Sequence, residues 1–212
     1  MNEKGVLTIP DAFNEISETL STAESILDNA VDNAKTLFHT LVLSSHDEDK
    51  IVSRVVVLRE FNPKERYLRF HTDARAPKIK HFQKNSNASI LGYDPALKIQ
   101  IKLQGYVEVH LDNDVTKASW NESTTRSKKC YSVDGGSSLE IDNPAEYDLK
   151  DGNIEDGYLN FAVLKFKYTS LEFLYLNQCS LFRFLKIDTC ISFYVHINFV
   201  YVYIFYHIRI QT

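Results

Sequence analysis

The N-terminal part of the chain repeats apolar residues at helical spacing. After Pro10, apolar side chains recur at intervals close to the helical repeat as far as Val31, with acidic residues between them. This spacing is typical of one face of an amphipathic helix. We therefore predict a helical segment within residues 1–35 that packs against the rest of the fold.

From Thr36 onward the pattern changes to the alternation of apolar and polar positions that is typical of strands. Residues 37–43 alternate, residues 44–49 supply turn-forming side chains, and residues 51–58 form a β-branched run. These segments predict a hairpin. After a second turn, residues 67–72 predict a third strand, so the three strands together predict an antiparallel meander.

The middle and the C-terminal half continue with helices, strands and one long loop. Residues 77–84 have a helical pattern that begins at a proline, and Asp73 is a candidate cap for this helix. Residues 134–157 are rich in Gly, Ser, Asp and Glu and predict a mobile loop. The other predicted elements are strands over 88–93, 97–111 and 158–168, a further apolar element over 171–176, a helix over 115–123 capped from within 112–114, and a short helix over 126–131.

The predicted strand over residues 97–111 has two different faces. Its odd-numbered positions from Ile99 to Leu103 are apolar, whereas its even-numbered positions from Gln100 to Gln104 are polar. Because successive side chains of a strand point to opposite faces, Gln100 does not belong to the core face. The polar face either lies in solvent or contacts a ligand.

Composition limits the class of protein. The chain has 212 residues, 44% of them apolar, which suffices for one substantial core. Its net charge of −4 gives no overall attraction to nucleic acid, so anion binding requires a local cluster of cations. Cys130, Cys179 and Cys190 are too few and too widely spaced for a disulfide framework or a metal site. The polar N-terminus does not resemble a secretory signal, so we expect a cytoplasmic protein.

A local cluster of cations does follow the second predicted strand. A phosphate monoester is bound best by a bidentate guanidinium, a lysine and backbone amides at a helix N-terminus. Arg59, Arg75 and Lys78 offer these groups. The alternative is that these residues, like most charged side chains, are ordinary surface cations.

Four fragments in a fixed order resemble a known family. They are Arg54-Val-Val-Val-Leu-Arg59, Phe70-His-Thr-Asp73, Arg75-Ala-Pro-Lys78 and Gln100-Ile-Lys-Leu-Gln-Gly105. The series resembles the pyridoxamine 5'-phosphate oxidase-like split-barrel family, whose corresponding segments bind flavin mononucleotide (FMN). The fragment Thr72-Asp-Ala-Arg75-Ala-Pro-Lys78 is similar to the branch with the pattern Thr-Asp-x-Arg-Ser-x-Lys, with Ala76 in place of Ser.

The resemblance implies a mainly β fold with flanking helices, namely a six-stranded antiparallel split β-barrel over residues 36–186. It also implies FMN as the cofactor, a homodimer with flavin at the subunit interface, and a flavin-dependent oxidoreductase acting on a small molecule. The isoalloxazine ring of FMN needs an apolar slot and hydrogen-bonding groups at its pyrimidine edge. The residues that the resemblance marks as FMN-binding candidates are Arg54, Val55, Val56, Leu58, Arg59, His71, Thr72, Arg75, Lys78 and Gln100.

The chain also departs from the family pattern. His71 replaces a frequent Tyr, Lys102 replaces the usual Arg, and the C-terminal Trp and Arg-x-His segment of true oxidases is missing. We therefore leave the catalytic residues unassigned. The alternatives are a non-catalytic flavin-binding protein, a dimeric scaffold that has lost its substrate site, or a barrel for another ligand such as haem or a deazaflavin. His39, His81 and His110 have no spacing typical of an iron site and are expected to be ordinary surface or strand residues.

The last segment, residues 187–212, differs in composition from the rest. Residues 191–208 are aromatic and aliphatic without Asp, Glu, Lys or Arg, and their length approaches that of a membrane span. Tyrosines, His196 and Asn198 interrupt the segment, so we do not expect a membrane anchor. We expect either an extra strand that covers the barrel or a translated end that an incorrect gene model has added.

Overall fold

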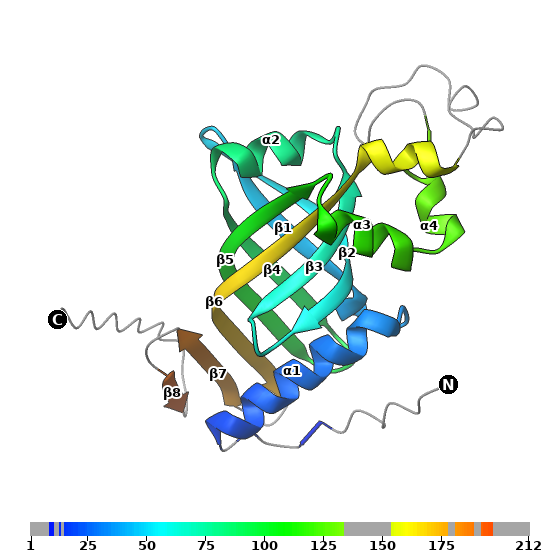
Figure 1. Cartoon of the computed structure of the whole chain (residues 1–212). Helices are drawn as coiled ribbons and strands as arrows, with labels where there is room; N and C mark the ends of the chain where they lie inside the picture. The colour runs from blue at the N-terminus through cyan, green and yellow to red at the C-terminus, as the bar shows by residue number, and fades with distance from the viewer. Residues whose placement is uncertain are drawn as a thin grey trace.

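The computed structural model describes residues 9–10, 13, 15–133, 154–177, 181–188 and 192–196. Antiparallel strands form a closed ring at its centre (Figure 1). Neighbours follow the order β3-β2-β1-β4-β5-β6, and β6 pairs with β3 to close the ring. The predicted six-stranded antiparallel barrel with flanking helices is confirmed. The ring strands are β1 (Thr40–Asp47), β2 (Lys50–Asn62), β3 (Tyr67–Asp73), β4 (Asn87–Asp94), β5 (Ile99–Leu111) and β6 (Phe161–Asn177).

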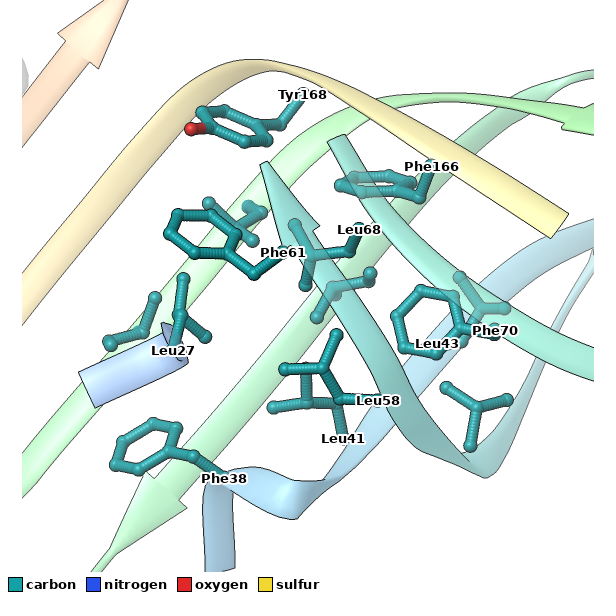
Figure 2. Packing of buried hydrophobic residues seen from close by; sticks show 14 of the residues in the cluster. Leu27, Phe38, Leu41, Leu43, Leu58, Phe61, Leu68, Phe70, Phe166 and Tyr168 are labelled. Carbon is teal, nitrogen blue, oxygen red and sulfur yellow. The ribbon is translucent and has the colours of Figure 1, made fainter. Parts of the chain in front are cut away.

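Strands β1, β2 and β3 form the predicted antiparallel meander. Alternation along β2 separates a core face from an outer face. Val56 and Leu58 are buried inside the barrel, while Val55 between them is 65% exposed. Figure 2 shows Leu58 packed among Leu41 and other apolar side chains of the barrel interior.

Strand β6 is longer than the sequence pattern predicts. The two predicted segments, 158–168 and 171–176, form one strand of 17 residues, Phe161–Asn177. Its pairing with β5 shifts between Gln104 and Gly105, where the extra residue Thr169 bulges out. A Cβ at Gly105 would lie 1.9 Å from the carbonyl oxygen of Lys167, so only glycine fits beside this bulge. On one side of the bulge, the first half of β6 pairs with β3 and closes the ring. On the other side, its second half pairs with a further strand, β7, outside the ring.

Two more strands extend the sheet beyond the ring. Strand β7 (Leu181–Asp188) pairs with the second half of β6, and β8 (Ser192–His196) pairs with β7. Residues 192–196 of the unusual C-terminal segment thus form a strand, but it pairs with β7 beyond the ring, and the two explanations given for this segment stay predictions. Residues 197–212 lie outside the described residues. The division into segments 1–35, 36–186 and 187–212 stays a prediction.

Helix α1 (Ile16–Asp32) packs its apolar face against the barrel, as predicted. It begins at Ile16 and has no side-chain cap at Glu15. Leu27 of this helix and Phe38 of the short 3₁₀ helix η1 (Leu37–His39) are both fully buried in the core (Figure 2). Each such side chain contributes about 1.5–3 kcal/mol of apolar burial. In Figure 1, α1 lies across the end of the barrel opposite to α2.

The other helices lie close to the candidate residues. Helix α2 (Pro77–Lys84) has the predicted bounds, but the prediction that Asp73 caps it was wrong. The N-cap is Ala76, without a side-chain hydrogen bond, because the Asp73 carboxylate binds the backbone and side chain of Arg75 instead.

Helix α3 (Asp114–Glu122) is capped by Asn113, within the predicted capping segment. Helix α4 (Thr125–Lys129) follows it, and η3 (Ile154–Asn160) leads into β6. The last residues of the predicted loop, 154–157, thus belong to η3, whereas residues 134–153 lie outside the described part of the chain. No helix among the described residues combines the length and the apolar character needed to cross a membrane.

Candidate functional site

Arg54 lies at one end of the barrel, on the side of β2 that also carries the inward-facing Val56. Its Nη1 donates hydrogen bonds to the Leu43 carbonyl oxygen (3.2 Å) and to Ser45 Oγ (2.8 Å). Within the described residues, Nε and Nη2 donate to no protein acceptor. Since a guanidinium has five N–H donors, the Nε–Nη2 edge is available for a bidentate contact with an oxyanion.

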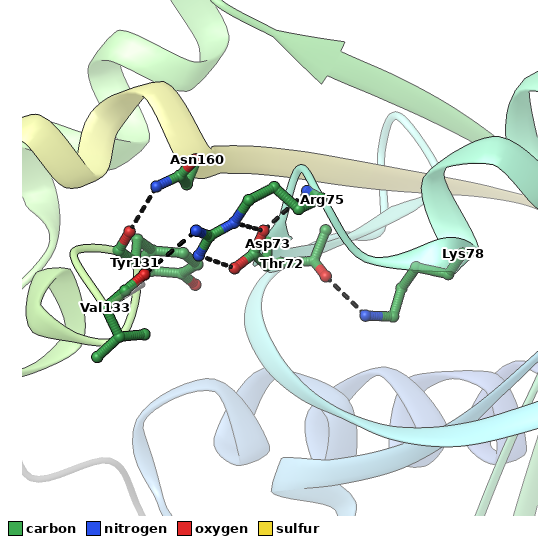
Figure 3. Close-up of polar contacts among 7 residues, drawn as sticks. All are labelled: Thr72, Asp73, Arg75, Lys78, Tyr131, Val133 and Asn160. Atoms are coloured by element: carbon green, nitrogen blue, oxygen red, sulfur yellow. Dashed lines mark hydrogen bonds and ion pairs between the residues drawn. The ribbon is translucent and has the colours of Figure 1, made fainter. Parts of the chain in front are cut away.

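Lys78 comes to the same place from the first turn of α2. Its Nζ donates a hydrogen bond to Thr72 Oγ1 (2.9 Å) at the end of β3 (Figure 3). Burial lowers the pKa of Lys78, and the positive charge of Arg54 lowers it further, whereas Asp73 acts in the opposite direction. Burial also lowers the pKa of Arg54.

The two cations lack a neutralising partner. In the part of the chain that the structure describes, neither Arg54 nor Lys78 forms an ion pair with a carboxylate. The two half-buried positive charges repel each other, since Arg54 lowers the pKa of Lys78, and an anion between them would relieve this repulsion. We call Arg54, Thr72 and Lys78 the cation pair site.

Arg75, a further predicted phosphate ligand, is already paired. Its Nε and Nη2 donate to the two carboxylate oxygens of Asp73 at 3.0 and 2.7 Å, and its Nη1 donates to the Val133 carbonyl oxygen at 3.2 Å (Figure 3). Asp73 balances the charge of Arg75 locally. Arg75 therefore attracts an external anion less than Arg54 and Lys78 do.

A second group of candidates lies on the outer side of β2 and β3. Arg59 is exposed at a bulge in the pairing of β2 with β3, a feature that redirects a side chain. His71 contacts Phe161 edge to face with 5.0 Å between ring centroids, and its Nε2 is buried without a hydrogen-bond partner in the described structure. Burial, together with Arg69 and Arg59, lowers the pKa of His71 to about 3. His71 is therefore neutral at physiological pH.

The low pKa of His71 predicts a pH-dependent stability. The unfolded chain, with a histidine pKa of about 6.5, binds a proton that the folded chain does not, so stability is full above about pH 6.5 and falls below it. We expect the free energy of unfolding to drop by about 1 kcal/mol from this residue between about pH 6.5 and 5.5. In urea unfolding, the free energy of unfolding of His71→Gln should drop by about 1 kcal/mol less over this pH range than that of the wild-type protein. The exposed His46, replaced by Gln, is the control, and an equal pH dependence of all three proteins would contradict the burial of His71.

The remaining FMN-binding candidates lie on different faces of the barrel strands. Val56 and Leu58 lie in the core, so only their backbone could contact a ligand, whereas Val55 is exposed. Gln100 is half-buried on the outer side of β5, between Tyr93 and Leu174. The strand register places Leu103, which is three residues after Gln100, level with Arg54 across β1 and β4. A single chain thus brings Arg54, Thr72 and Lys78 together, and leaves Gln100 three strands away on the other face.

Sequence reasoning missed two residues beside the cation pair site. Ser45, only 2% exposed, holds Arg54, and His81 of α2 lies next to Ser45 with 3.4 Å between Oγ and Nδ1. His81 was expected to be an ordinary surface or strand residue, which was wrong, because its side chain is 11% exposed and lies at the end of the barrel. The signal in the sequence was its position three residues after Lys78, which places both side chains on one side of the helix.

The fold is a six-stranded antiparallel split barrel with flanking helices, and it matches solved structures of FMN-binding split barrels. A family model described as "Pyridoxamine 5'-phosphate oxidase, FMN-binding domain" matches residues 21–111, a segment that contains every candidate site residue. The resemblance to this family that the motifs carry is therefore supported by the sequence match and by the fold. The narrower branch with the Thr-Asp-x-Arg-Ser-x-Lys pattern stays a prediction.

Solved structures agree with this fold. A pyridoxamine 5'-phosphate oxidase-related, FMN binding protein from Nostoc punctiforme is similar with a TM-score of 0.65 and 17% identity, over 88% of this chain and 99% of that one. PhzG from Burkholderia lata, solved in complex with tetrahydrophenazine-1-carboxylic acid, has a TM-score of 0.59 and 16% identity, over 86% of this chain and 90% of that one. At these identities the likeness concerns the fold. A comparison with curated proteins found no match.

Proposed function

We propose that this protein binds FMN and that its cation pair site holds the phosphate. One observation carries the proposal: the half-buried Arg54 and Lys78 influence each other electrostatically and, among the described residues, have no ion-pairing carboxylate, within a segment that matches an FMN-binding domain family. The Nε–Nη2 edge of Arg54 would bind two phosphate oxygens, and Lys78 would supply a point charge. Arg59, exposed near His71, would add to the positive field around the ligand.

The chain also offers groups for the flavin ring. Among the described residues, Nε2 of His71 has no hydrogen-bond partner, and a neutral imidazole can exchange one hydrogen bond with the polar edge of a ring. The backbone of Val56 and Leu58 lies on β2, the strand that also carries Arg54 of the cation pair site. When bound, FMN supplies electron and hydride transfer, and the protein residues bind and orient it.

A second copy of the chain is the partner that we propose. The outer face of β2, β4 and β5 carries apolar side chains that are 39% to 72% exposed. They belong to one surface, because Val55 is paired with Val42, and Val42 with Leu91. A groove of about 410 Å³ lies over β1, β4 and β5 on the same surface. Gln100 also faces this side, so a second copy docked here would bring a Gln100 toward a flavin shared by two chains. The exposed apolar residues of this face are Ile51, Val55, Leu91, Tyr93 and Tyr106.

The dimer proposal predicts that a charge on this face separates the subunits. Val55→Asp is expected to weaken dimerisation at least about a hundredfold, because an unpaired carboxylate would be buried in the interface. Light scattering during size-exclusion chromatography measures this change. Leu159→Asp on η3, where the side chain is 82% exposed, is the matched control and should leave the dimer intact. A wild-type protein that is monomeric with FMN bound would contradict the proposal.

For the activity, we propose a flavin-dependent oxidoreductase with a small-molecule substrate, acting in the cytoplasm. The alternative is a flavin-binding protein without turnover, which the missing C-terminal Trp and Arg-x-His segment favours. Anaerobic mixing of the FMN-loaded protein with a reduced nicotinamide separates the two. Loss of the oxidised flavin absorbance supports the oxidoreductase, and an unchanged spectrum with this and with amine substrates supports the alternative.

FMN binding itself is tested by titration. The wild-type protein is added to FMN and, separately, to riboflavin, which has the same ring without the phosphate, and flavin fluorescence is followed. We expect tight binding of FMN and much weaker binding of riboflavin, because the cation pair site has no phosphate to bind in riboflavin. Equal affinity for the two flavins would contradict the assignment of the phosphate to Arg54 and Lys78.

A further inference from the structure

A series of polar contacts connects Arg54 of the cation pair site to Asp47. Arg54 Nη1 donates to Ser45 Oγ at 2.8 Å, Ser45 Oγ lies 3.4 Å from His81 Nδ1, and His81 Nε2 lies 3.5 Å from Asp47 Oδ1. Ser45 is 2% exposed, so its hydroxyl is a buried polar group whose hydrogen bonds matter. None of these three partners belongs to the predicted FMN-binding residues.

The direction of each hydrogen bond follows from the groups present. Arg54 can only donate, so Ser45 Oγ accepts from it and has its own proton left to donate. His81 Nδ1 accepts that proton when the imidazole carries its hydrogen on Nε2, and this Nε2–H then faces the Asp47 carboxylate. All the hydrogen bonds of this series can therefore point in one direction, from Arg54 to Asp47.

This arrangement fixes the orientation of the Arg54 guanidinium. Both Nη1 protons are used, one on the Leu43 carbonyl oxygen and one on Ser45 Oγ. With Nη1 held, the planar group keeps a fixed orientation, and its Nε–Nη2 edge has no protein acceptor among the described residues. The same helix, α2, carries both His81 and Lys78, so the contact of His81 with Ser45 also sets where Lys78 lies relative to Arg54.

We propose that Ser45 and His81 are positioning residues that give this site its selectivity for a phosphate monoester, an inference that rests on the proposed FMN binding. Ser45 contacts Arg54, and His81 connects Ser45 to α2, so together they orient Arg54 relative to the helix that carries Lys78. Loss of either contact leaves both charges present but poorly oriented. The phosphate-bearing flavin then loses affinity, while the flavin without phosphate does not.

The test compares FMN and riboflavin affinities of four variants with those of the wild-type protein. Ser45→Ala, which removes a hydrogen bond to the charged Arg54, and His81→Leu, which removes the group that orients Ser45, are expected to weaken FMN binding about tenfold. Riboflavin binding should change less than about twofold in both variants. Ser44→Ala is the matched control, because Ser44 lies one residue away and its hydroxyl contacts Ser53 instead. His81→Asn keeps an acceptor at the place of Nδ1 and should retain most of the FMN affinity.

The outcomes separate the two proposals. A wild-type protein that binds neither flavin, or both equally, overturns the proposed function and with it this inference. A wild-type protein that prefers FMN, together with Ser45→Ala and His81→Leu variants that keep the same preference, overturns the inference alone. If Ser45→Ala does not fold, the pair His81→Leu and His81→Asn decides, and equal FMN affinity of these two variants contradicts the positioning role.

Discussion

Replacing Arg54 or Lys78 with alanine is expected to weaken FMN binding about a hundredfold, because each side chain would supply about two charge-assisted hydrogen bonds of about 1.5 kcal/mol each. Neither side chain forms an ion pair with a carboxylate in the described structure, so little else depends on its charge. Fluorescence titration with FMN measures the loss. Riboflavin binding should change little in the same variants, since the lost interactions are with the phosphate.

The control for this prediction lies on the same helix. Lys84 is an exposed cation in the last turn of α2, with its Nζ 3.9 Å from a carboxylate oxygen of Glu48. Lys84→Ala removes the same charge from the protein at a different place and should leave FMN binding within about twofold. If Lys78→Ala and Lys84→Ala weaken binding equally, the effect is one of net charge, and the cation pair site is not the phosphate site.

The largest effect on stability is expected for Phe166→Ala. Phe166 is fully buried at the closure of the ring, where β6 pairs with β3 opposite Leu68 and with β5 opposite Val107 (Figure 2). Removal of a buried phenyl ring leaves a cavity and costs about 3–5 kcal/mol, a large part of the total stability of a domain. Equilibrium unfolding in urea measures the change in the free energy of unfolding.

The control for Phe166 is an exposed leucine. Leu159 of η3 is 82% exposed, so Leu159→Ala should change the free energy of unfolding by less than about 0.5 kcal/mol. A loss below about 1 kcal/mol for Phe166→Ala would contradict the placement of this ring in the barrel core.

Much of the barrel could be predicted from local patterns. The β-branched run of residues 51–58 indicated β2, and the alternation along residues 97–111 indicated β5 and its core face. The bounds of α2 followed from Pro77 and the helical pattern after it. Strand β6 was divided in two because the bulge at Thr169 breaks the alternation, and a bulge depends on the partner strand. The prediction that Asp73 caps α2 was wrong because its carboxylate accepts from the backbone and side chain of Arg75, two residues further on, and this local contact competes with capping.

The candidate site was predicted only in part, because some of its contacts join residues that are far apart in the sequence. Motif resemblance selected Arg54, Thr72 and Lys78, which the fold brings together, but it also selected Val56 and Leu58, whose side chains belong to the core. Ser45 and His81 stayed hidden because they are 36 positions apart in the chain and meet only in the folded protein. The residues behind a binding site carry no motif of their own.

The central claim, that this chain binds FMN, is tested most directly by purifying the protein and identifying what it carries. An absorbance spectrum of the native protein is recorded as purified and again after incubation with FMN. The protein is then denatured, and the released small molecules are separated by liquid chromatography beside FMN and riboflavin standards. Our account predicts the bands of oxidised flavin on the native protein and FMN as the released molecule. A protein that stays colourless after incubation with FMN and removal of the excess would contradict it.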